Sequence, residues 1–330
     1  MSNTVRLGLI GCGGFMGAHV QRLSSVRKAR IVALADPNEQ NLARFVERHP
    51  QVRKAKQFAT YEEMLKAAEL DGVIIASPHT LHAEQIRASL KRGFHVLTEK
   101  PMACSVKEAR SVIRAAKRYD RILMIGYQRH FSPAFRLARD IIASGKLGKV
   151  TFAAALQAQN WLEGTRGTWR QDPALSGGGQ LNDSGSHLVD IVLWVTGLRP
   201  EVVYAQMDNR GSRVDILSSL AMRFQGGAIG SFSVIGDAPQ WWEDISWYCE
   251  RGALYVREGR LLLQAAGTTE DITGRLKYAG DPDKNFVDCI VGKDEPQTPA
   301  ICGLRVAELT EAAWESAKSG RPAKVRRARS

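Results

Sequence analysis

The first 125 residues alternate between short apolar runs and longer segments whose apolar residues recur every three or four positions. The short runs, rich in Val, Ile and Ala, lie at 5–11, 29–36, 71–77, 93–99 and 121–127. Such nearly continuous apolar runs are typical of parallel strands buried on both faces, and the segments between them of covering helices. The pattern predicts a doubly wound α/β domain with a parallel sheet over residues 1–125.

The pattern changes after a predicted helix at 132–144. From Lys149 onward seven strand candidates follow one another, interrupted by one helix at about 183–196. Strands in series joined by Gly-rich turns predict an α+β domain with an open, mainly antiparallel sheet over residues 126–330. Two helices, at 281–292 and 303–318, close the chain. The second is a candidate to pack back on the first domain, and residues 321–330 are expected to form a frayed basic tail.

Composition narrows the class of protein. The chain has 330 residues, of which 44% are hydrophobic, so it carries enough apolar side chains for two folded domains. Its net charge is +12, but part of the surplus lies in the tail and in a run at 53–56. Because no helix-turn-helix or zinc-finger pattern accompanies that charge, we expect no nucleic-acid partner.

Cysteines and apolar runs bear on the compartment. The five cysteines are scattered and odd in number, which suits a reducing compartment. No segment resembles a signal peptide or a membrane span, so we expect a cytoplasmic protein with no membrane partner. The scattered His and Cys residues give no metal-ligand spacing, and no metal is expected.

A glycine-rich turn follows the first predicted strand. Gly11 and Gly13 are in register with the first two glycines of G-x-G-x-x-G, whereas the third is displaced to Gly17, after Phe15 and Met16. At this place a dinucleotide-binding fold needs a tight turn and close backbone approach to a pyrophosphate, although many strand-to-helix turns also contain glycine. The turn therefore favours a nucleotide cofactor.

Asp36 ends the second predicted strand. A carboxylate there can accept hydrogen bonds from the adenosine ribose and repel a 2′-phosphate. No Arg follows, so NAD is favoured over NADP. The alternative is a turn-forming Asp before Pro37.

Two further segments carry candidate chemistry. Glu99-Lys100-Pro101 ends a predicted parallel strand, where ligands bind in open α/β folds, or where a lysine is simply solvated. After three consecutive glycines, Asp183 and His187 stand four residues apart, so on a helix they share one face and could act on one hydroxyl group. A His with a nearby carboxylate is equally the common form of a structural histidine.

Together these motifs resemble the Gfo/Idh/MocA family of nicotinamide-dependent oxidoreductases over nearly the whole chain. The resemblance lies in five elements in order: the glycine turn, Ser77-Pro78-His79-Thr80-Leu81-His82, Glu99-Lys100-Pro101, the GYQRHF run at 126–131, and GGG-x-L-x-D-x-x-x-H-x-x-D. It implies a Rossmann domain, an α+β domain whose sheet forms a homodimer or homotetramer interface, and NAD as cofactor.

The resemblance also implies roles for residues. Lys100, Asp183 and His187 are similar to the catalytic residues of the family. Cofactor-side positions are those of the glycine turn (Gly11, Gly13, Phe15, Met16) together with Asp36, Ser77, His79, His82, Glu99, Lys100, Gln128 and Arg170. Candidate substrate residues are Tyr127, Arg129, Trp161 and Trp169.

Alcohol oxidation requires a base for the hydroxyl proton and a cation for the developing alkoxide. His187 suits the base, Lys100 suits the cation or a proton relay, and Asp183 can orient the imidazole or hold a neighbouring hydroxyl. Trp faces in the segment 160–175 favour a sugar, a cyclic polyol or a glycoside, although its arginines could pair with an acidic substrate. The expected function is an NAD-dependent dehydrogenase of such a secondary hydroxyl. Two alternatives are a retained-NAD enzyme that oxidises its substrate transiently, as in glycoside cleavage, and an NAD-sensing regulatory protein.

Overall fold

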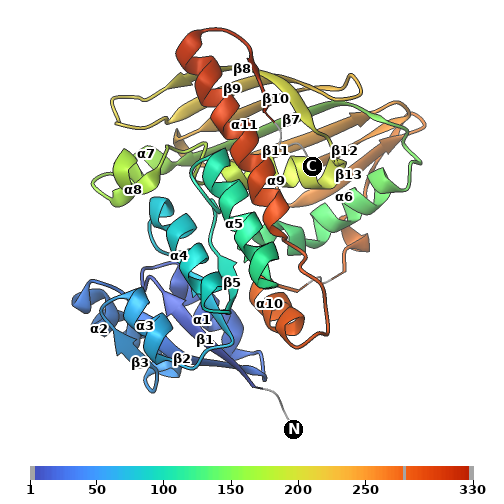
Figure 1. Ribbon diagram of the computed structural model, residues 1–330. Helices are drawn as coiled ribbons and strands as arrows, with labels where there is room; N and C mark the ends of the chain where they lie inside the picture. Colours follow the sequence, from blue (N-terminus) through green and yellow to red (C-terminus); the bar gives the residue numbers. More distant parts are fainter. Residues whose placement is uncertain (1–3, 278–279, 327–330) are drawn as a thin grey trace. The chain divides into compact units, whose positions relative to one another are not determined.

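The computed structural model describes residues 4–277 and 280–326 (Figure 1). The chain forms two compact units. Unit 1 contains the residues up to Ala103, Lys107–Gln128 and Gly280–Gly303, and unit 2 contains Cys104–Val106, Arg129–Ala279 and the residues from Leu304 onward. The sequence pattern assigns residues 280–303 to the second domain, whereas in the structure they belong to the first unit.

Unit 1 is built on a 6-stranded sheet in the order β3-β2-β1-β4-β5-β6, and every neighbouring pair is parallel. Its strands are β1 (Val5–Ile10), β2 (Ala29–Ala35), β3 (Lys56–Phe58), β4 (Gly72–Ile75), β5 (His95–Thr98) and β6 (Leu123–Ile125). Its helices are α1 (Met16–Ser24), α2 (Glu39–Arg48), α3 (Tyr61–Ala67), α4 (His79–Lys91), α5 (Val106–Tyr119) and α10 (Pro282–Ile290). The strand order reverses between β1 and β4, where open α/β sheets bind ligands at the carboxyl ends of the strands.

The core of unit 1 explains why α10 belongs to it. Phe286 and Val287 of α10 are fully buried in the same apolar cluster as Leu9 of β1, Ile74 of β4 and Leu97 of β5. The strands alternate with helices as the sequence predicts. The short strand β3 was not predicted, because its three residues, Lys-Gln-Phe, are polar or half-exposed and form no apolar run.

Unit 2 is built on a 9-stranded sheet in the order β14-β13-β12-β11-β7-β10-β9-β8-β15, antiparallel except for the pair β7–β10. Its strands are β7 (Val150–Asn160), β8 (Pro200–Asp208), β9 (Leu217–Phe224), β10 (Ile229–Ile235), β11 (Asp237–Cys249), β12 (Gly252–Arg257), β13 (Arg260–Ala265), β14 (Thr268–Asp271) and β15 (Ala323–Lys324). Its helices are α6 (Pro133–Ala143), α7 (Trp161–Gly164), α8 (Pro173–Ser176), α9 (Gly185–Thr196) and most of α11 (Ala300–Ser319). The predicted fold class, a parallel doubly wound sheet followed by a mainly antiparallel one, is confirmed.

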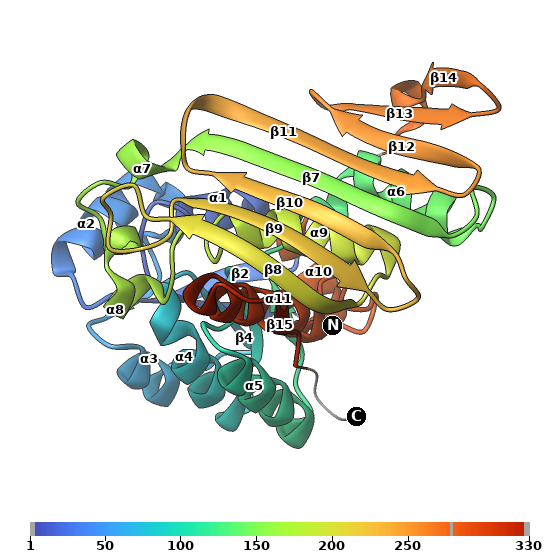
Figure 2. The same cartoon turned by 90° about the horizontal axis from the view of Figure 1, so that it is seen from above.

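The two faces of the unit 2 sheet differ. One face packs against α6, α9 and α11, as Figure 2 shows, and it carries buried side chains such as Trp247 and Phe232. The opposite face carries exposed or half-exposed large side chains on neighbouring strands: Tyr204, Ile229, Phe152, Tyr248 and Tyr255. Alternation along antiparallel strands produces this two-sidedness.

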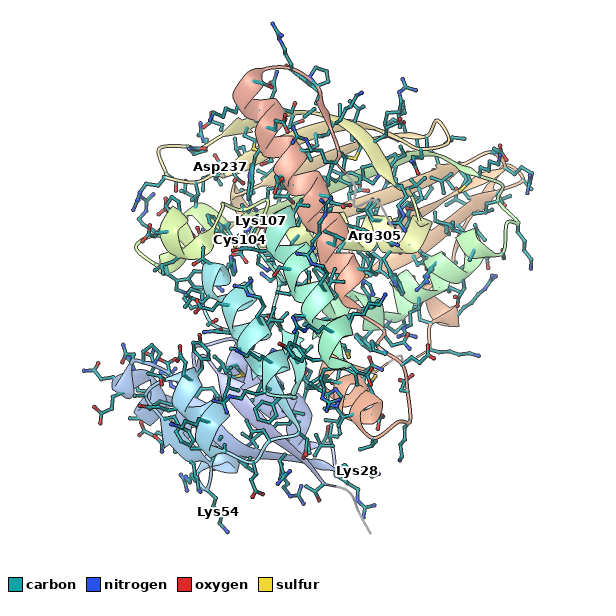
Figure 3. The ribbon with its side chains drawn as sticks, in the orientation of Figure 1. Lys28, Lys54, Cys104, Lys107, Asp237 and Arg305 are labelled. Atoms are coloured by element: carbon teal, nitrogen blue, oxygen red, sulfur yellow. The ribbon has the colours of Figure 1, made fainter. Side chains whose placement is uncertain are left out.

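Two expectations about exposed segments can be compared with the structure. The basic tail is ordered in part, because Ala323 and Lys324 pair with Val203 and Val202 of β8; residues 327–330 lie outside the described residues. In the basic run at 53–56, Lys54 projects outward from unit 1 (Figure 3). In the part of the chain that the structure describes, no helix combines the length and the apolar character that a membrane crossing requires.

Candidate active-site residues

The glycine turn of unit 1 requires glycine at its first position. Gly11 has φ +85°, and a Cβ there would lie 2.7 Å from the backbone nitrogen of Ser77. A Cβ on Gly13 or Gly14, in contrast, would meet no described atom within 4 Å. The turn thus packs its first glycine against the end of β4 and leaves the next two open, as a backbone cradle for a pyrophosphate requires.

The first turn of α1 leaves its backbone N–H groups without a side-chain cap. Its N-cap residue Phe15 makes no capping hydrogen bond, and its ring is 43% exposed. Met16 is fully buried, so its side chain belongs to the core and only its backbone could reach a ligand. The displaced Gly17 lies under the ring of His49, where a Cβ would approach to 2.8 Å. An uncapped helix start beside open glycines suits an anionic group.

Asp36 fastens the glycine turn to the end of β2. One carboxylate oxygen accepts a hydrogen bond from the Cys12 backbone N–H at 2.8 Å, and the other accepts one from Asn38 N–H at 2.9 Å. Burial, and then the charge of Asp36, raise the pKa of the Cys12 thiol to about 12. The carboxylate lies where the sequence predicts it, and each oxygen keeps a lone pair for a ribose hydroxyl.

The segment between β4 and α4 is held by polar groups that are almost fully buried. The Ser77 hydroxyl donates to Gln85 Oε1 at 2.6 Å, and His79 begins α4 with 3% of its surface exposed. His82 is fully buried, with Nδ1 2.8 Å from the Pro101 carbonyl oxygen and Nε2 2.9 Å from that of Ser77. Through these contacts His82 joins the segment after β4, at Ser77, to the segment after β5, at Pro101.

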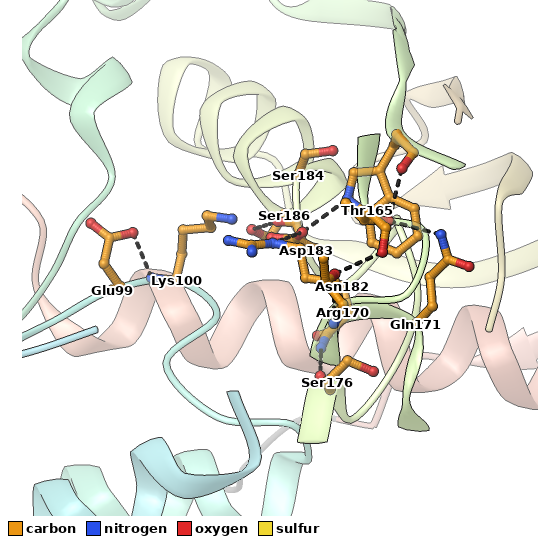
Figure 4. Close-up of polar contacts among 12 residues, drawn as sticks. Glu99, Lys100, Thr165, Arg170, Gln171, Ser176, Asn182, Asp183, Ser184 and Ser186 are labelled. Carbon is orange, nitrogen blue, oxygen red and sulfur yellow. Dashed lines mark hydrogen bonds and ion pairs between the residues drawn. The ribbon is translucent and has the colours of Figure 1, made fainter. Parts of the chain in front are cut away.

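Glu99 and Lys100 follow β5 at the same edge of the sheet. Glu99 is 5% exposed, and its Oε2 accepts a hydrogen bond from the Lys100 backbone N–H at 3.3 Å (Figure 4). Its Oε1 lies 3.2 Å from Nε2 of His19 on α1, a residue that the motifs did not point to. Gln128 is half-buried, whereas Tyr127 is fully buried and therefore presents no side-chain surface in this structure.

In unit 2, Asp183 lies in the turn immediately before α9 rather than inside the helix. Its carboxylate Oδ2 accepts hydrogen bonds from the indole N–H of Trp161 at 2.9 Å and from Nε of Arg170 at 3.1 Å, and Figure 4 shows the latter pair. The side chain of Asp183 is 5% exposed. One backbone turn later, His187 N–H donates to the Ser184 carbonyl, and the His187 side chain is half-exposed.

The candidate substrate residues have different surroundings. Trp161 is 5% exposed and packs with Val214 and Ile216, so it supports Asp183 from below the surface. Trp169 is half-exposed, and the guanidinium of Arg170 lies 4.6 Å from its ring centre. Arg129 forms a buried ion pair with Glu243 of β11, with 2.5 Å between Nη1 and Oε2. Burial lowers the pKa of Arg129 despite Glu243, and burial raises the pKa of Glu243 despite Arg129.

Sequence reasoning missed the residue that holds the glycine segment before Asp183. Asp215 is 7% exposed; its Oδ1 accepts hydrogen bonds from the N–H of Gly179 at 3.0 Å and from Trp314 Nε1 at 3.1 Å. Its Oδ2 accepts one from the N–H of Leu181 at 2.9 Å. A Cβ on Gly179 would lie 2.0 Å from the Asp215 carbonyl oxygen. The glycines at 177–179 therefore allow close approach to Asp215, a partner that no local motif contains.

Comparison with protein families gives the class. Residues 5–127 match the oxidoreductase family with an NAD-binding Rossmann fold, and residues 135–255 match the Gfo/Idh/MocA C-terminal domain. The chain belongs to the Gfo/Idh/MocA family, which confirms the resemblance drawn from the motifs and the NAD-binding character of unit 1.

Individual relatives are more distant. The chain is 33% identical to the rhizopine catabolism protein MocA of Rhizobium meliloti over 203 residues, 59% of this chain and 58% of that protein. It is 31% identical to glucose-6-phosphate 3-dehydrogenase of Bacillus subtilis over 207 residues, 62% of this chain and 57% of that protein. The match thus spans less than two thirds of the length of these two relatives.

Solved structures match over almost the full length. The WlbA dehydrogenase from Bordetella pertussis, in complex with NADH and UDP-GlcNAcA, superposes with a TM-score of 0.89 over 99% of both chains at 24% identity. Levoglucosan dehydrogenase, in complex with NADH and levoglucosan, gives 0.87 over 98% of this chain and 100% of that one at 20% identity. At these identities the likeness shows the fold.

Proposed function

We propose that the protein is an NAD-dependent dehydrogenase that oxidises a secondary hydroxyl group of a sugar, cyclic polyol or glycoside. The observation that carries the proposal is the arrangement of unit 1. Four candidate segments follow four adjacent strands at the carboxyl edge of one parallel sheet. Asp36 follows β2, the glycine turn follows β1, Ser77 follows β4 and Glu99-Lys100 follows β5. The open glycines and the anchored Asp36 fit a dinucleotide whose adenosine ribose lacks a 2′-phosphate.

Each candidate residue has a defined task in this reaction. Bound NAD would accept the hydride from the carbinol carbon. The His187 imidazole accepts the hydroxyl proton, and the Lys100 ammonium stabilises the developing alkoxide or relays the proton. Asp183, held by Trp161 and Arg170, accepts a hydrogen bond from the imidazole or from a neighbouring hydroxyl. These roles remain predictions from motif and local geometry.

The test is a steady-state assay that follows the absorbance of reduced nicotinamide with NAD or NADP and a panel of inositols, aldoses, sugar acids and glycosides. Lys100→Ala and His187→Ala should each lower kcat by about two to four decades, because each removes a proton-transfer or charge-stabilising group. NAD affinity should change little. Near-wild-type turnover in both variants would remove these residues from the mechanism.

We further propose that the open face of the unit 2 sheet associates with a second copy of the chain. Tyr248 is 40% exposed and lies edge-on to Phe152 and Tyr255, with ring centres 6.3 and 5.7 Å away. A cluster of neighbouring, partly exposed aromatic side chains is typical of protein–protein interfaces. Tyr248→Glu should reduce the molar mass measured by light scattering, whereas Lys107→Glu, on an exposed position of α5, should not. An unchanged mass for Tyr248→Glu would place any association elsewhere.

A further inference from the structure

A group of four charged side chains, three of them buried, lies at the Glu99–Lys100 segment of unit 1. His19 of α1 is fully buried between two carboxylates: Nδ1 lies 2.6 Å from Asp283 Oδ1 of α10, and Nε2 lies 3.2 Å from Glu99 Oε1. Arg22, one turn further along α1, donates from Nε to the second oxygen of Asp283. The group joins α1, α10 and the end of β5.

The contacts of His19 favour its charged form. A neutral imidazole carries one N–H and one lone pair, so it can donate to only one of two carboxylates. Nδ1 also lies 3.2 Å from Nη2 of Arg22, but the carboxylate of Asp283 is nearer, and two carboxylates favour the cationic ring, in which both nitrogens carry hydrogen. Burial alone would lower the pKa of His19, but Asp283 and Glu99 outweigh it and raise the pKa to about 9. Two cations and two anions then balance, and the Phe15 ring packs edge-on against the imidazole, with 5.8 Å between the ring centres.

Glu99 connects this group to Lys100. Its Oε2 holds the Lys100 backbone N–H, and its Oε1 packs against Gly126, where a Cβ would lie only 2.2 Å from that oxygen. The carboxylate therefore has one position, set by His19 and by the absence of a side chain at 126. On the other side of Lys100, the Pro101 carbonyl oxygen lies against buried His82. The main chain is thus fastened to a buried histidine both before and after Lys100.

We propose that His19 is a positioning residue that acts through Glu99 to set the orientation and the reactivity of the Lys100 amine. The proposal rests on the proposed function only in assigning Lys100 to catalysis. Without the imidazolium, Asp283 keeps Arg22 and Glu99 keeps the Lys100 backbone N–H, but both lose the cation that lies between them, and a buried carboxylate that loses its cation takes up a proton or moves. In either case the Lys100 main chain loses its fixed acceptor.

The experiment compares His19→Gln, Glu99→Gln and the double variant. His95→Gln serves as the control, since His95 lies at the opposite end of β5 and accepts a hydrogen bond from the Ile122 backbone N–H. His19→Gln should lower kcat by about tenfold to a hundredfold, as expected for a misplaced reacting group, with the Kd for NAD changed by no more than about threefold. The double variant should lose no more than the worse single variant, because both changes act through one carboxylate. Multiplicative losses would overturn the proposal, as would wild-type kcat in folded His19→Gln.

A second readout needs neither substrate nor cofactor. The acylation rate of the Lys100 amine, measured by mass spectrometry relative to exposed Lys107, should change by at least about threefold in His19→Gln and stay constant in His95→Gln. An unchanged Lys100 rate in His19→Gln also contradicts the proposal. Lys100→Ala in the activity assay separates the catalytic role of Lys100 from its control by His19. Normal turnover in that variant would refute the catalytic role of Lys100. The acylation rate would still decide whether His19 controls the lysine.

Discussion

The charge of His19 predicts a specific dependence of stability on pH. Its folded pKa, about 9, lies well above the ordinary value of about 6.5, so the folded state holds a proton that the unfolded state releases between these values. The stabilisation is therefore fully present below about pH 6.5 and is lost as the pH rises through about 9. At about 1.4 kcal/mol per pKa unit, the loss is about 3 kcal/mol in the free energy of unfolding.

Other groups act outside this window. Burial lowers the pKa of His82 and of His95, so their contributions grow as the pH rises toward about 6.5 and are complete there. Burial, followed by Asp36, raises the pKa of Cys12 to about 12, so its contribution is lost only at more alkaline pH. Between about pH 6.5 and 9 the fall should therefore come mainly from His19.

The assay is urea unfolding of the wild type and of His19→Gln at a series of pH values, followed by far-UV circular dichroism. All seven Trp residues belong to unit 2, so Trp fluorescence measured in parallel separates unit 2 from changes in unit 1. The free energy of unfolding of the wild type should exceed that of the variant most below about pH 6.5, and the difference should shrink by about 3 kcal/mol as the pH rises to 9.5. A constant difference, or one that grows with pH, would show that His19 is neutral in the folded protein.

Two predictions concern the other buried carboxylates. Asp36→Ala should weaken NAD binding and reduce the preference for NAD over NADP, measured as the ratio of the two dissociation constants. An unchanged ratio would show that Asp36 does not select the cofactor. Asp215→Asn places an amide where Oδ1 and Oδ2 accept three N–H donors, so at least one donor faces another donor. We expect the variant to lose about 1–3 kcal/mol in unfolding free energy and to have a lower kcat. Stability and activity equal to those of the wild type would show that Asp215 does not hold the segment before Asp183.

The sequence predicts the fold well because period and order are local properties. Nearly continuous apolar runs mark β1, β2, β4, β5 and β6, and each is followed by an amphipathic segment. It fails where the local pattern is weak. β3 has three polar or half-exposed residues, and α10 reads as part of the second domain, although Phe286 packs in the first core. That assignment depends on contacts with β5, β4 and β1, strands that lie between about 190 and 280 residues earlier in the chain, which no hydrophobic pattern encodes.

Individual site residues divide in the same way. The glycine turn, Glu99-Lys100 and Asp183 stand in motifs, so the sequence alone points to them, whereas Trp161 has a buried supporting position that its aromatic character alone could not reveal. The i, i+4 spacing of Asp183 and His187 suggested one helical face. The structure instead places Asp183 in the turn before α9, where an indole and a guanidinium orient its carboxylate.

Three buried carboxylates show why motifs reveal the chemistry but not its support. Asp36 holds the glycine turn through Cys12, 24 residues away, and Asp215 holds Gly179, 36 residues away. Asp283 acts on His19, 264 residues away, and through it on Glu99. A buried carboxylate requires hydrogen-bond donors, and a loop that approaches a ligand has backbone N–H groups that require acceptors. A carboxylate beside such a loop therefore satisfies both groups. Any residue order that brings the two together in the fold satisfies this requirement, and therefore the supporting acid can lie anywhere in the sequence.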